Sequence, residues 1–150
     1  MVEARSDVTV PAPAAEVFDV VSDINHATWL PAVRGLRHVG GPKKGVGARY
    51  EVEVGALGRH LRGVLVCTEM TPPKRIVLTL EEGIQLRIQV VVRAVRGGCN
   101  VDIAAVYSVG SGPFSGAVER ASQGAARREV ARACEQLAAR FGRKSARTTA

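Results

Sequence analysis

Apolar and polar residues alternate along the middle of the chain. Every second position is apolar between residues 46 and 54, and residues 84–92 repeat the pattern. The apolar positions are Val46, Ala48, Tyr50, Val52 and Val54 in the first stretch, and Ile84, Leu86, Ile88, Val90 and Val92 in the second. A period of two is typical of a β-strand with one buried face and one face in water. Both stretches therefore predict strands of an antiparallel sheet.

Glycine and proline clusters divide the rest of the chain into further strands. Gly40-Gly41-Pro42, Pro72-Pro73 and Gly97-Gly98 are turn signals between apolar stretches. The predicted strands are residues 6–10, 34–40, 46–55, 58–70, 75–81, 84–95 and 99–109. Because the connections between most of them are short, neighbouring strands should run antiparallel.

Two short helices are predicted after the first strand. Pro13 suits the first turn of a helix, where its missing N–H costs nothing. The apolar residues that follow recur at helical spacing and are Val17, Val20, Val21 and Ile24. A second helical turn covers residues 25–30, includes Trp29 and stops before Pro31, because the residue preceding a proline is disfavoured in a helix.

A long helix is predicted at residues 114–141, with Gly142 as its C-terminal cap. The side chains that its first half offers to the sheet are small, and they are Ala117, Val118, Ala121, Ser122, Ala125 and Ala126. Such a helix either approaches the sheet closely or leaves a cavity, and the residues alone leave both arrangements open. Residues 143–150 are predicted to be a disordered basic tail, so that one domain spans residues 1–142.

The order of these elements predicts an α+β fold. A sheet with one apolar face must be covered, and the C-terminal helix is the long amphipathic element available to cover it. The charge of the chain adds little to this interpretation. The net charge is +7, but Arg140, Arg143, Lys144 and Arg147 lie in the last eleven residues. The body is therefore only mildly basic.

Several classes of function are disfavoured by composition. Basic and aromatic residues do not alternate as a base-stacking surface requires, so we expect no nucleic-acid partner. Apolar runs are too short to span a membrane and no apolar leader is visible, so a cytoplasmic protein is expected. Cys67, Cys99 and Cys134 lie far apart and are expected to be reduced thiols.

Residues 10–33 resemble the opening signature of the polyketide cyclase/dehydrase and lipid-transport proteins, the START-like or SRPBCC superfamily. Gly45-Val-Gly47, the segment Glu69-Met-Thr-Pro-Pro-Lys-Arg75 and Gly97-Gly98 agree with it, and the likeness extends to about Gly142. The resemblance implies a helix-grip fold. In that fold a seven-stranded antiparallel sheet wraps around a long C-terminal helix, with two short helices after the first strand and an apolar cavity inside.

The resemblance and the apolar faces together favour a protein that binds an apolar or amphipathic small molecule, lipid- or polyketide-like, between the sheet and the C-terminal helix. The predicted lining residues are Trp29, Tyr50, Val52, Leu65, Cys67, Leu78, Leu86, Ile88, Val90, Ile103, Tyr107, Val118, Ala121, Ser122 and Ala125. The resemblance implies that Trp29 lies at the cavity mouth or in its lining. The alternative is a hydrophobic plug between the two short helices.

The alternative function is a polyketide cyclase or aromatase that promotes aldol-type ring closure of a poly-keto chain. Its candidate catalytic residues are His60, Arg62, Tyr50 and Tyr107. A bulge at Gly63 would turn His60 or Arg62 inward, and without it both are exposed cationic side chains. The three histidines have no partners at metal-ligand spacing, so neither a metal nor a cofactor is expected. An interaction module that uses the arginine-rich helix face is a third possibility.

Overall fold

The computed structural model describes residues 2–31, 33–56, 59–81, 85–108 and 115–142, and for residues 56, 59–61, 115, 116, 118 and 119 it describes the backbone alone. The strands are β1 (Val2–Val10), β2 (Val33–Gly40), β3 (Arg49–Ala56), β4 (Arg59–Thr71), β5 (Arg75–Glu81), β6 (Gln85–Val95) and β7 (Gly98–Ser108). The helices are α1 (Ala14–Ser22), the 3-10 helix η1 (Ile24–His26) and α2 (Ser115–Phe141).

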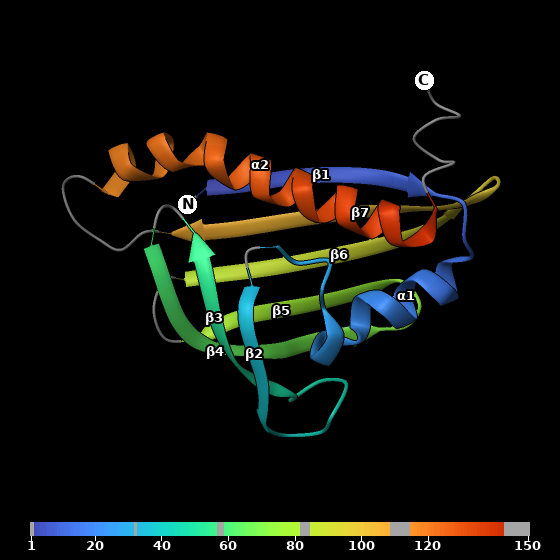
Figure 1. Ribbon diagram of the computed structural model, residues 1–150, viewed down its shortest axis with the longest axis horizontal. Coiled ribbons are helices and arrows are strands. Elements are labelled where there is room, and N and C mark those ends of the chain that lie inside the picture. The colour runs from blue at the N-terminus through green and yellow to red at the C-terminus, as the bar shows by residue number, and fades with distance from the viewer. Residues whose placement is uncertain (1, 32, 57–58, 82–84, 109–114, 143–150) are drawn as a thin grey trace.

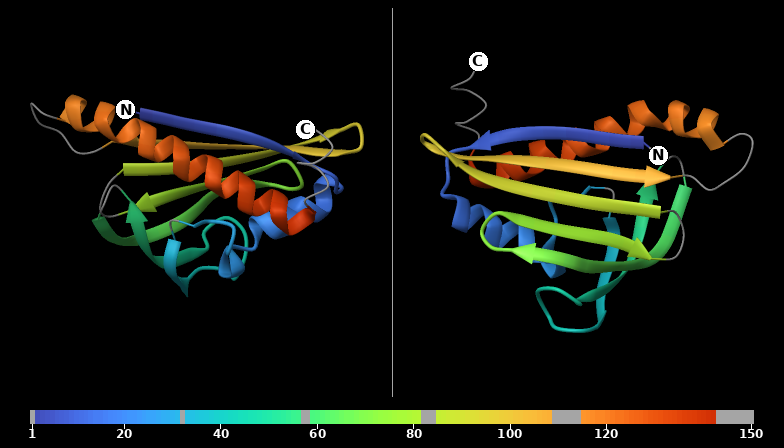
Figure 2. Two further views of the ribbon diagram at one scale, coloured as in Figure 1. Left: turned by 45° about the horizontal axis from the view of Figure 1, so that its top comes forward. Right: turned by 180° about the vertical axis from the view of Figure 1, so that it is seen from behind.

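The seven strands form one antiparallel sheet in the order β1-β7-β6-β5-β4-β3-β2. The sheet curves around α2, and both helices lie on the same side of it (Figures 1 and 2). This is the α+β helix-grip architecture that the sequence predicts. Among the described residues no helix is long and apolar enough to cross a membrane.

Strand pairing gives the sheet one apolar inner face and one outer face of mixed polarity, where polar residues alternate with apolar ones such as Val77. Tyr50 lies opposite Leu65 in the β3–β4 pair, and Val90 lies opposite Ile103 in the β6–β7 pair. These residues are at most 3% exposed. The neighbouring positions, such as Glu51, point to the other face, because successive side chains of a strand alternate.

The two helices cover different parts of the inner face. Helix α2 packs against β1 and β7, whereas α1 packs against β6 and β7. The C-terminal half of α2 supplies the buried residues Val130, Ala133, Cys134 and Leu137. This half closes one end of the fold around a continuous apolar core.

Three element boundaries differ from the predictions. Strand β1 begins at Val2 rather than at residue 6, because Val2 pairs with Tyr107 and extends the ladder. Strand β3 begins at Arg49, and Val46 lies in the preceding turn, 58% exposed. The second helical segment is the single turn η1 and is shorter than residues 25–30. Gly142 follows α2 with φ +117°, as a C-terminal cap requires.

Candidate ligand-binding site

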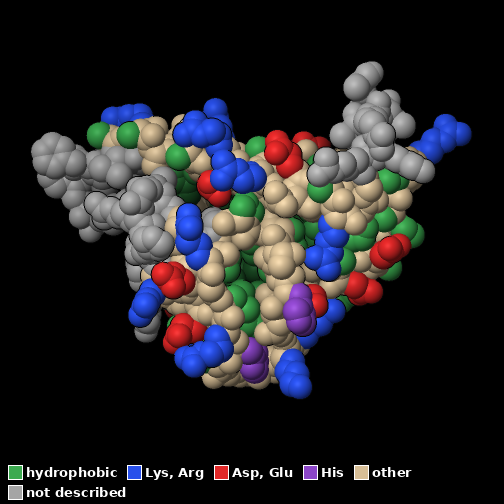
Figure 3. Space-filling view, in the orientation of Figure 1, with side chains coloured by type: hydrophobic (Ala, Val, Ile, Leu, Met, Phe, Trp, Pro, Cys, Tyr) green, Lys and Arg blue, Asp and Glu red, His purple; other side chains and the backbone are tan. Residues whose placement is uncertain are grey.

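The inner face is incompletely covered at the end that lies below the first half of α2. Leu86 and Ile88 belong to β6, a central strand, and point to the inner face, yet both are partly exposed. Side chains in such a position remain exposed only where no other element packs on them. The partly exposed apolar residues here are Leu36, Val54, Leu86, Ile88, Ala105 and Ala126, and the space they line is called the inner hollow. Figure 3 shows hydrophobic side chains recessed below α2.

The opposite end of the same face is closed. Val90 and Val92, the next inner residues along β6, are each 1% exposed, and their partners Ile103 and Val101 are as deeply buried. The C-terminal half of α2 and helix α1 account for this coverage. The inner hollow is therefore a local feature of one half of the sheet.

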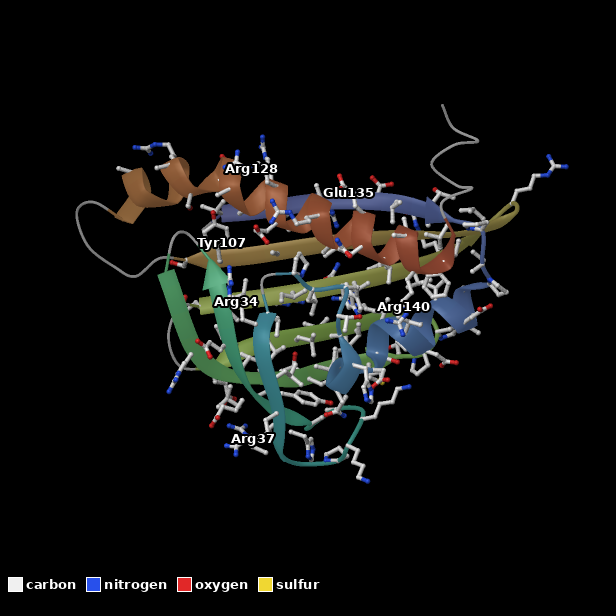
Figure 4. The ribbon with its side chains drawn as sticks, in the orientation of Figure 1. Arg34, Arg37, Tyr107, Arg128, Glu135 and Arg140 are labelled. Atoms are coloured by element: carbon white, nitrogen blue, oxygen red, sulfur yellow. The ribbon has the colours of Figure 1, made fainter. Side chains whose placement is uncertain are left out.

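A pair of hydroxyl groups joins the sheet to the small-residue half of α2. Tyr107 Oη and Ser122 Oγ lie 2.7 Å apart, and both residues are buried, at 4% and 8% exposure. Figure 4 shows Tyr107 directly beneath α2. Tyr107 pairs with Leu86 across β6 and β7, so the hydroxyl pair borders the inner hollow. It is a polar point beside an apolar surface.

The predicted lining residues on the strands all lie on the inner face. Leu86, Ile88 and, on α2, Ala125 are partly exposed. Most of the others are buried in the core at 4% exposure or less, and they are Tyr50, Val52, Leu65, Cys67, Leu78, Val90, Ile103 and Tyr107. Ala121 is exposed on the helix surface, and the side chain of Val118 lies outside the described residues.

Trp29 is 2% exposed and belongs to the core cluster. Its indole nitrogen has no hydrogen-bond partner among the described residues. The adjacent Thr28 accepts a 3.2 Å hydrogen bond from Arg140 of α2, which fixes this segment against the helix. Trp29 is therefore part of the packed interior and not of the protein surface.

The Tyr50 hydroxyl is hydrogen-bonded to the turn between β2 and β3. It donates a 3.0 Å hydrogen bond to the Lys43 carbonyl oxygen. Burial raises the pKa of the Tyr50 hydroxyl, and Cys67 and Asp23 raise it further. Tyr50 therefore stays protonated at neutral pH and is unsuited to act as a general base.

Strand β4 carries two of the candidate catalytic residues, His60 and Arg62. The β3–β4 ladder runs without interruption from Arg49–Val66 to Ala56–Arg59, so Gly63 does not form the postulated bulge. Arg62 lies opposite Glu53 on the outer face and is exposed, on the side of the sheet away from the inner hollow. The irregularity of β4 lies instead between Cys67 and Glu69. The side chain of His60 is outside the described residues.

Residues 1–142 match the family described as polyketide cyclase / dehydrase and lipid transport. The chain belongs to this family. A search of curated proteins found no match. The match spans both the inner hollow and the helix that borders it, so the family identification applies to the whole described domain.

Solved structures of similar fold include proteins from three organisms. The protein TTHA0849 from Thermus thermophilus has a TM-score of 0.79 at 21% identity, over 95% of this chain and 99% of that one. The Zhui aromatase/cyclase from Streptomyces sp. R1128 has a TM-score of 0.77 at 14% identity, over 95% and 94%. A START superfamily protein from Mycobacterium smegmatis has a TM-score of 0.72 at 14% identity, over 95% and 98%. At these identities the similarity establishes the shared fold.

The thiols of this family member are not arranged for nucleophilic chemistry. Cys67, Cys99 and Cys134 are free and buried, and burial raises the pKa of each thiol. A protonated thiol is a poor nucleophile. Within the described ranges, no group of three His, Cys, Asp or Glu side chains is placed to hold a metal ion.

A second, shallow concavity lies on the outer face, with a volume of about 200 Å³. It is lined by Glu3, Arg5, Arg87, Gln89, Ala104 and Val106. Arg5 pairs there with Asp102 at 3.0 Å and with Glu3 at 3.6 Å, so much of its charge is already neutralised. This open, polar concavity is a weaker candidate site than the inner hollow.

The list of predicted lining residues omits four residues of the inner hollow, which are Leu36, Val54, Ala105 and Ala126. Val54 and Ala105 belong to the same alternating apolar sets as Tyr50 and Tyr107, so the pattern already placed them on the inner face. Leu36 carries no comparable sequence signal, because the alternation along β2 is weak.

Proposed function

We propose that this protein binds an apolar or amphipathic small molecule, lipid- or polyketide-like, in the inner hollow. The observation that carries the proposal is the partial exposure of Leu86 and Ile88 on the inner face of a central strand. Covering apolar surface contributes about 25 cal/mol per Å², so a ligand that covers roughly 100 Å² of it gains about 2.5 kcal/mol. Membership of the polyketide cyclase/dehydrase and lipid transport family supports this class of ligand.

The polar contribution to binding would come from Tyr107 and Ser122. Tyr107 Oη and Ser122 Oγ lie 2.7 Å apart, and each hydroxyl is of a kind that can both donate and accept hydrogen bonds. A ligand carbonyl or hydroxyl beside this pair would be oriented relative to the apolar surface. The proposed ligand is therefore mostly apolar, with an oxygen function at one position.

Filling the inner hollow tests the proposal. Ala126 of α2 borders it, whereas Ala139 on the same helix is exposed. The Ala126→Phe variant should weaken binding of the apolar probe 8-anilinonaphthalene-1-sulfonate by about tenfold or more, because the ring occupies the probe's space. The matched variant Ala139→Phe should bind the probe as the unmodified protein does. Fluorescence titration measures both affinities, and thermal unfolding checks that both variants fold.

Equal loss of binding in both variants, or loss in neither, would contradict binding in the inner hollow. The first result would indicate probe bound to the helix surface, and the second would indicate a site elsewhere. A variant that shows a cooperative thermal transition is folded at the temperature of the titration. A change in its affinity for the probe is then not caused by unfolding.

The second candidate function is cyclase or aromatase activity, and the Tyr107–Ser122 pair is the observation that favours it. The Tyr107 hydroxyl would donate a hydrogen bond to a substrate carbonyl and favour its enolate during aldol closure. Tyr107→Phe should then reduce ring closure of a linear poly-β-keto thioester by about a hundredfold or more. Chromatography of the cyclised product measures this. Probe affinity should change by no more than about tenfold, the worth of one hydrogen bond.

A further inference from the structure

The turn between β2 and β3 presents apolar and basic side chains together. Val46 is 58% exposed and Val39 is 46% exposed, and Val95 is the third exposed large hydrophobic residue within the described part of the chain. Lys43 and Lys44 lie between the two valines and are exposed. Neither lysine side chain forms an ion pair with another described residue. Residues 39–47 are called the β2–β3 tip.

Side chains outside and at the start of the turn hold the backbone of the β2–β3 tip through hydrogen bonds. The Lys43 carbonyl oxygen accepts hydrogen bonds from the Tyr50 hydroxyl at 3.0 Å and from Asn25 Nδ2 at 3.2 Å. His38 Nε2 lies 2.9 Å from the Pro42 carbonyl oxygen. These carbonyl groups are thus satisfied within the protein, while the side chains of Lys43, Lys44 and Val46 are exposed. Figure 1 shows the turn projecting from the end of the molecule away from α2.

The charged groups beside the tip are partly paired with one another. Arg37 pairs with Glu51 at 3.2 Å, and His26 Nδ1 lies 3.0 Å from Asp23 Oδ2. The Arg37–Glu51 pair therefore contributes little net charge to the tip. Figure 3 shows Lys, Arg and His side chains at this end of the molecule, with Asp and Glu side chains among them.

We propose that the β2–β3 tip docks on the surface of an anionic lipid bilayer. Lys43 and Lys44 would contact the lipid head groups, and Val39 and Val46 would enter the interface between head groups and acyl chains. The net charge of +7, to which Arg140, Arg143, Lys144 and Arg147 near the C-terminus contribute, has the sign required for attraction to such a surface. The proposal is independent of the proposed ligand function, because it concerns a surface that does not line the inner hollow.

A bilayer fits the tip better than a macromolecular partner does. A stable protein interface buries about 800 Å² on each partner, usually over a broad surface, whereas the tip is a single projecting turn. Single-stranded nucleic acids stack on aromatic side chains, and the exposed apolar residues of the tip are aliphatic. A bilayer surface deforms around a protrusion and accommodates lysine and valine side chains side by side.

Vesicle sedimentation tests the electrostatic part of the proposal. The protein should bind vesicles of equal parts phosphatidylglycerol and phosphatidylcholine, and should not bind phosphatidylcholine alone. The double variant K43Q/K44Q should bind about thirtyfold more weakly, since roughly 1 kcal/mol per basic residue corresponds to about fivefold for each lysine. The control K74Q/R96Q removes the same charge at other exposed turns and should change binding by less than about threefold.

Insertion of the apolar side chains is tested with two tryptophan variants. Val46→Trp should show fluorescence quenching by brominated lipids in the anionic vesicles, and Val95→Trp, an equally conservative change at the β6–β7 turn, should not. Both positions are exposed, so both variants should unfold at the temperature of the unmodified protein.

Four outcomes of the vesicle experiments would overturn the proposal. These are equal weakening in K43Q/K44Q and K74Q/R96Q, binding to phosphatidylcholine alone, no binding to anionic vesicles, or equal quenching of both tryptophans. Self-association that depends on Val46 in sedimentation velocity without vesicles would also overturn it, because the tip would then be an interface between copies of the chain. Ligand-probe binding measured without vesicles stays a separate readout of the inner hollow.

Discussion

The hydroxyl pair of Tyr107 and Ser122 is the feature on which the candidate site depends most at the residue scale. The sequence predicted both residues as lining, but their 2.7 Å contact depends on how α2 sits on β7. Strand alternation determines only which face Tyr107 occupies. The position of Ser122 along the sheet is set by tertiary packing, which no local pattern encodes.

Arg62 and Gly63 illustrate the limit of interpreting single residues. Glycine permits a β-bulge but does not require one. The unbroken ladder across Gly63 keeps Arg62 on the outer face, opposite Glu53. Similarly, Val46 continues the alternation in sequence, yet Gly45 and Gly47 adopt φ values of +104° and +93° and delay the strand.

Cys134 gives the protein a stability that depends on pH. Burial raises the pKa of its thiol from 9.0 to about 11, with Asp7, Asp102 and Glu135 adding to this and a hydrogen bond from Ser6 opposing it. Between these pKa values the unfolded chain loses the proton while the folded chain keeps it. The contribution of Cys134 to the free energy of unfolding should therefore be full below pH 9. Between about pH 9 and 11 it should fall by about 1.4 kcal/mol per pH unit.

Urea unfolding at a series of pH values between about 8 and 11 measures this dependence. The variant Cys134→Ala should lose stability at every pH because a packed side chain is removed, but its stability should fall less steeply above pH 9. Equal slopes for the two proteins would show that Cys134 does not contribute to the pH dependence.

At the scale of single elements, Gly124 is a glycine in the interior of helix α2, where it lowers the stability of the helix. Gly124 lies inside the helix and is exposed, and an added Cβ would meet only Arg128 Nη1, at 3.6 Å. Gly124→Ala should raise the free energy of unfolding by about 1 kcal/mol, because alanine loses less backbone entropy in a helix. Thermal unfolding measures the gain. An unchanged or lower unfolding temperature would contradict this placement of Gly124.

A glycine-to-alanine substitution should have the opposite effect where the end of β1 meets the start of β7. A Cβ at Gly98 would collide with the Val10 carbonyl oxygen, which is part of the backbone and cannot rotate away. Gly98→Ala should lower the free energy of unfolding by about 2 kcal/mol or more, measured by urea denaturation. A stability equal to that of the unmodified protein would show that the two strands have room to separate here.

At the scale of the whole molecule, the sheet and its covering helix were predictable because strand alternation and helical spacing are strong local signals. The inner hollow was harder to locate. Its existence depends on α2 packing against β1 and β7 and leaving Leu86 and Ile88 of β6 partly uncovered. Ala121, predicted as lining, is exposed, whereas the neighbouring Ser122 is buried.

The central claim is that the partly exposed inner face binds an apolar ligand, and methyl-group NMR with the probe 1-naphthol tests it most directly. The methyl signals of Leu86, Ile88 and Val54 should shift together and saturate, while those of the exposed Val39 and Val95 stay in place. Shifts confined to Val39, Val46 and Val95, or no saturable shift at all, would contradict the claim.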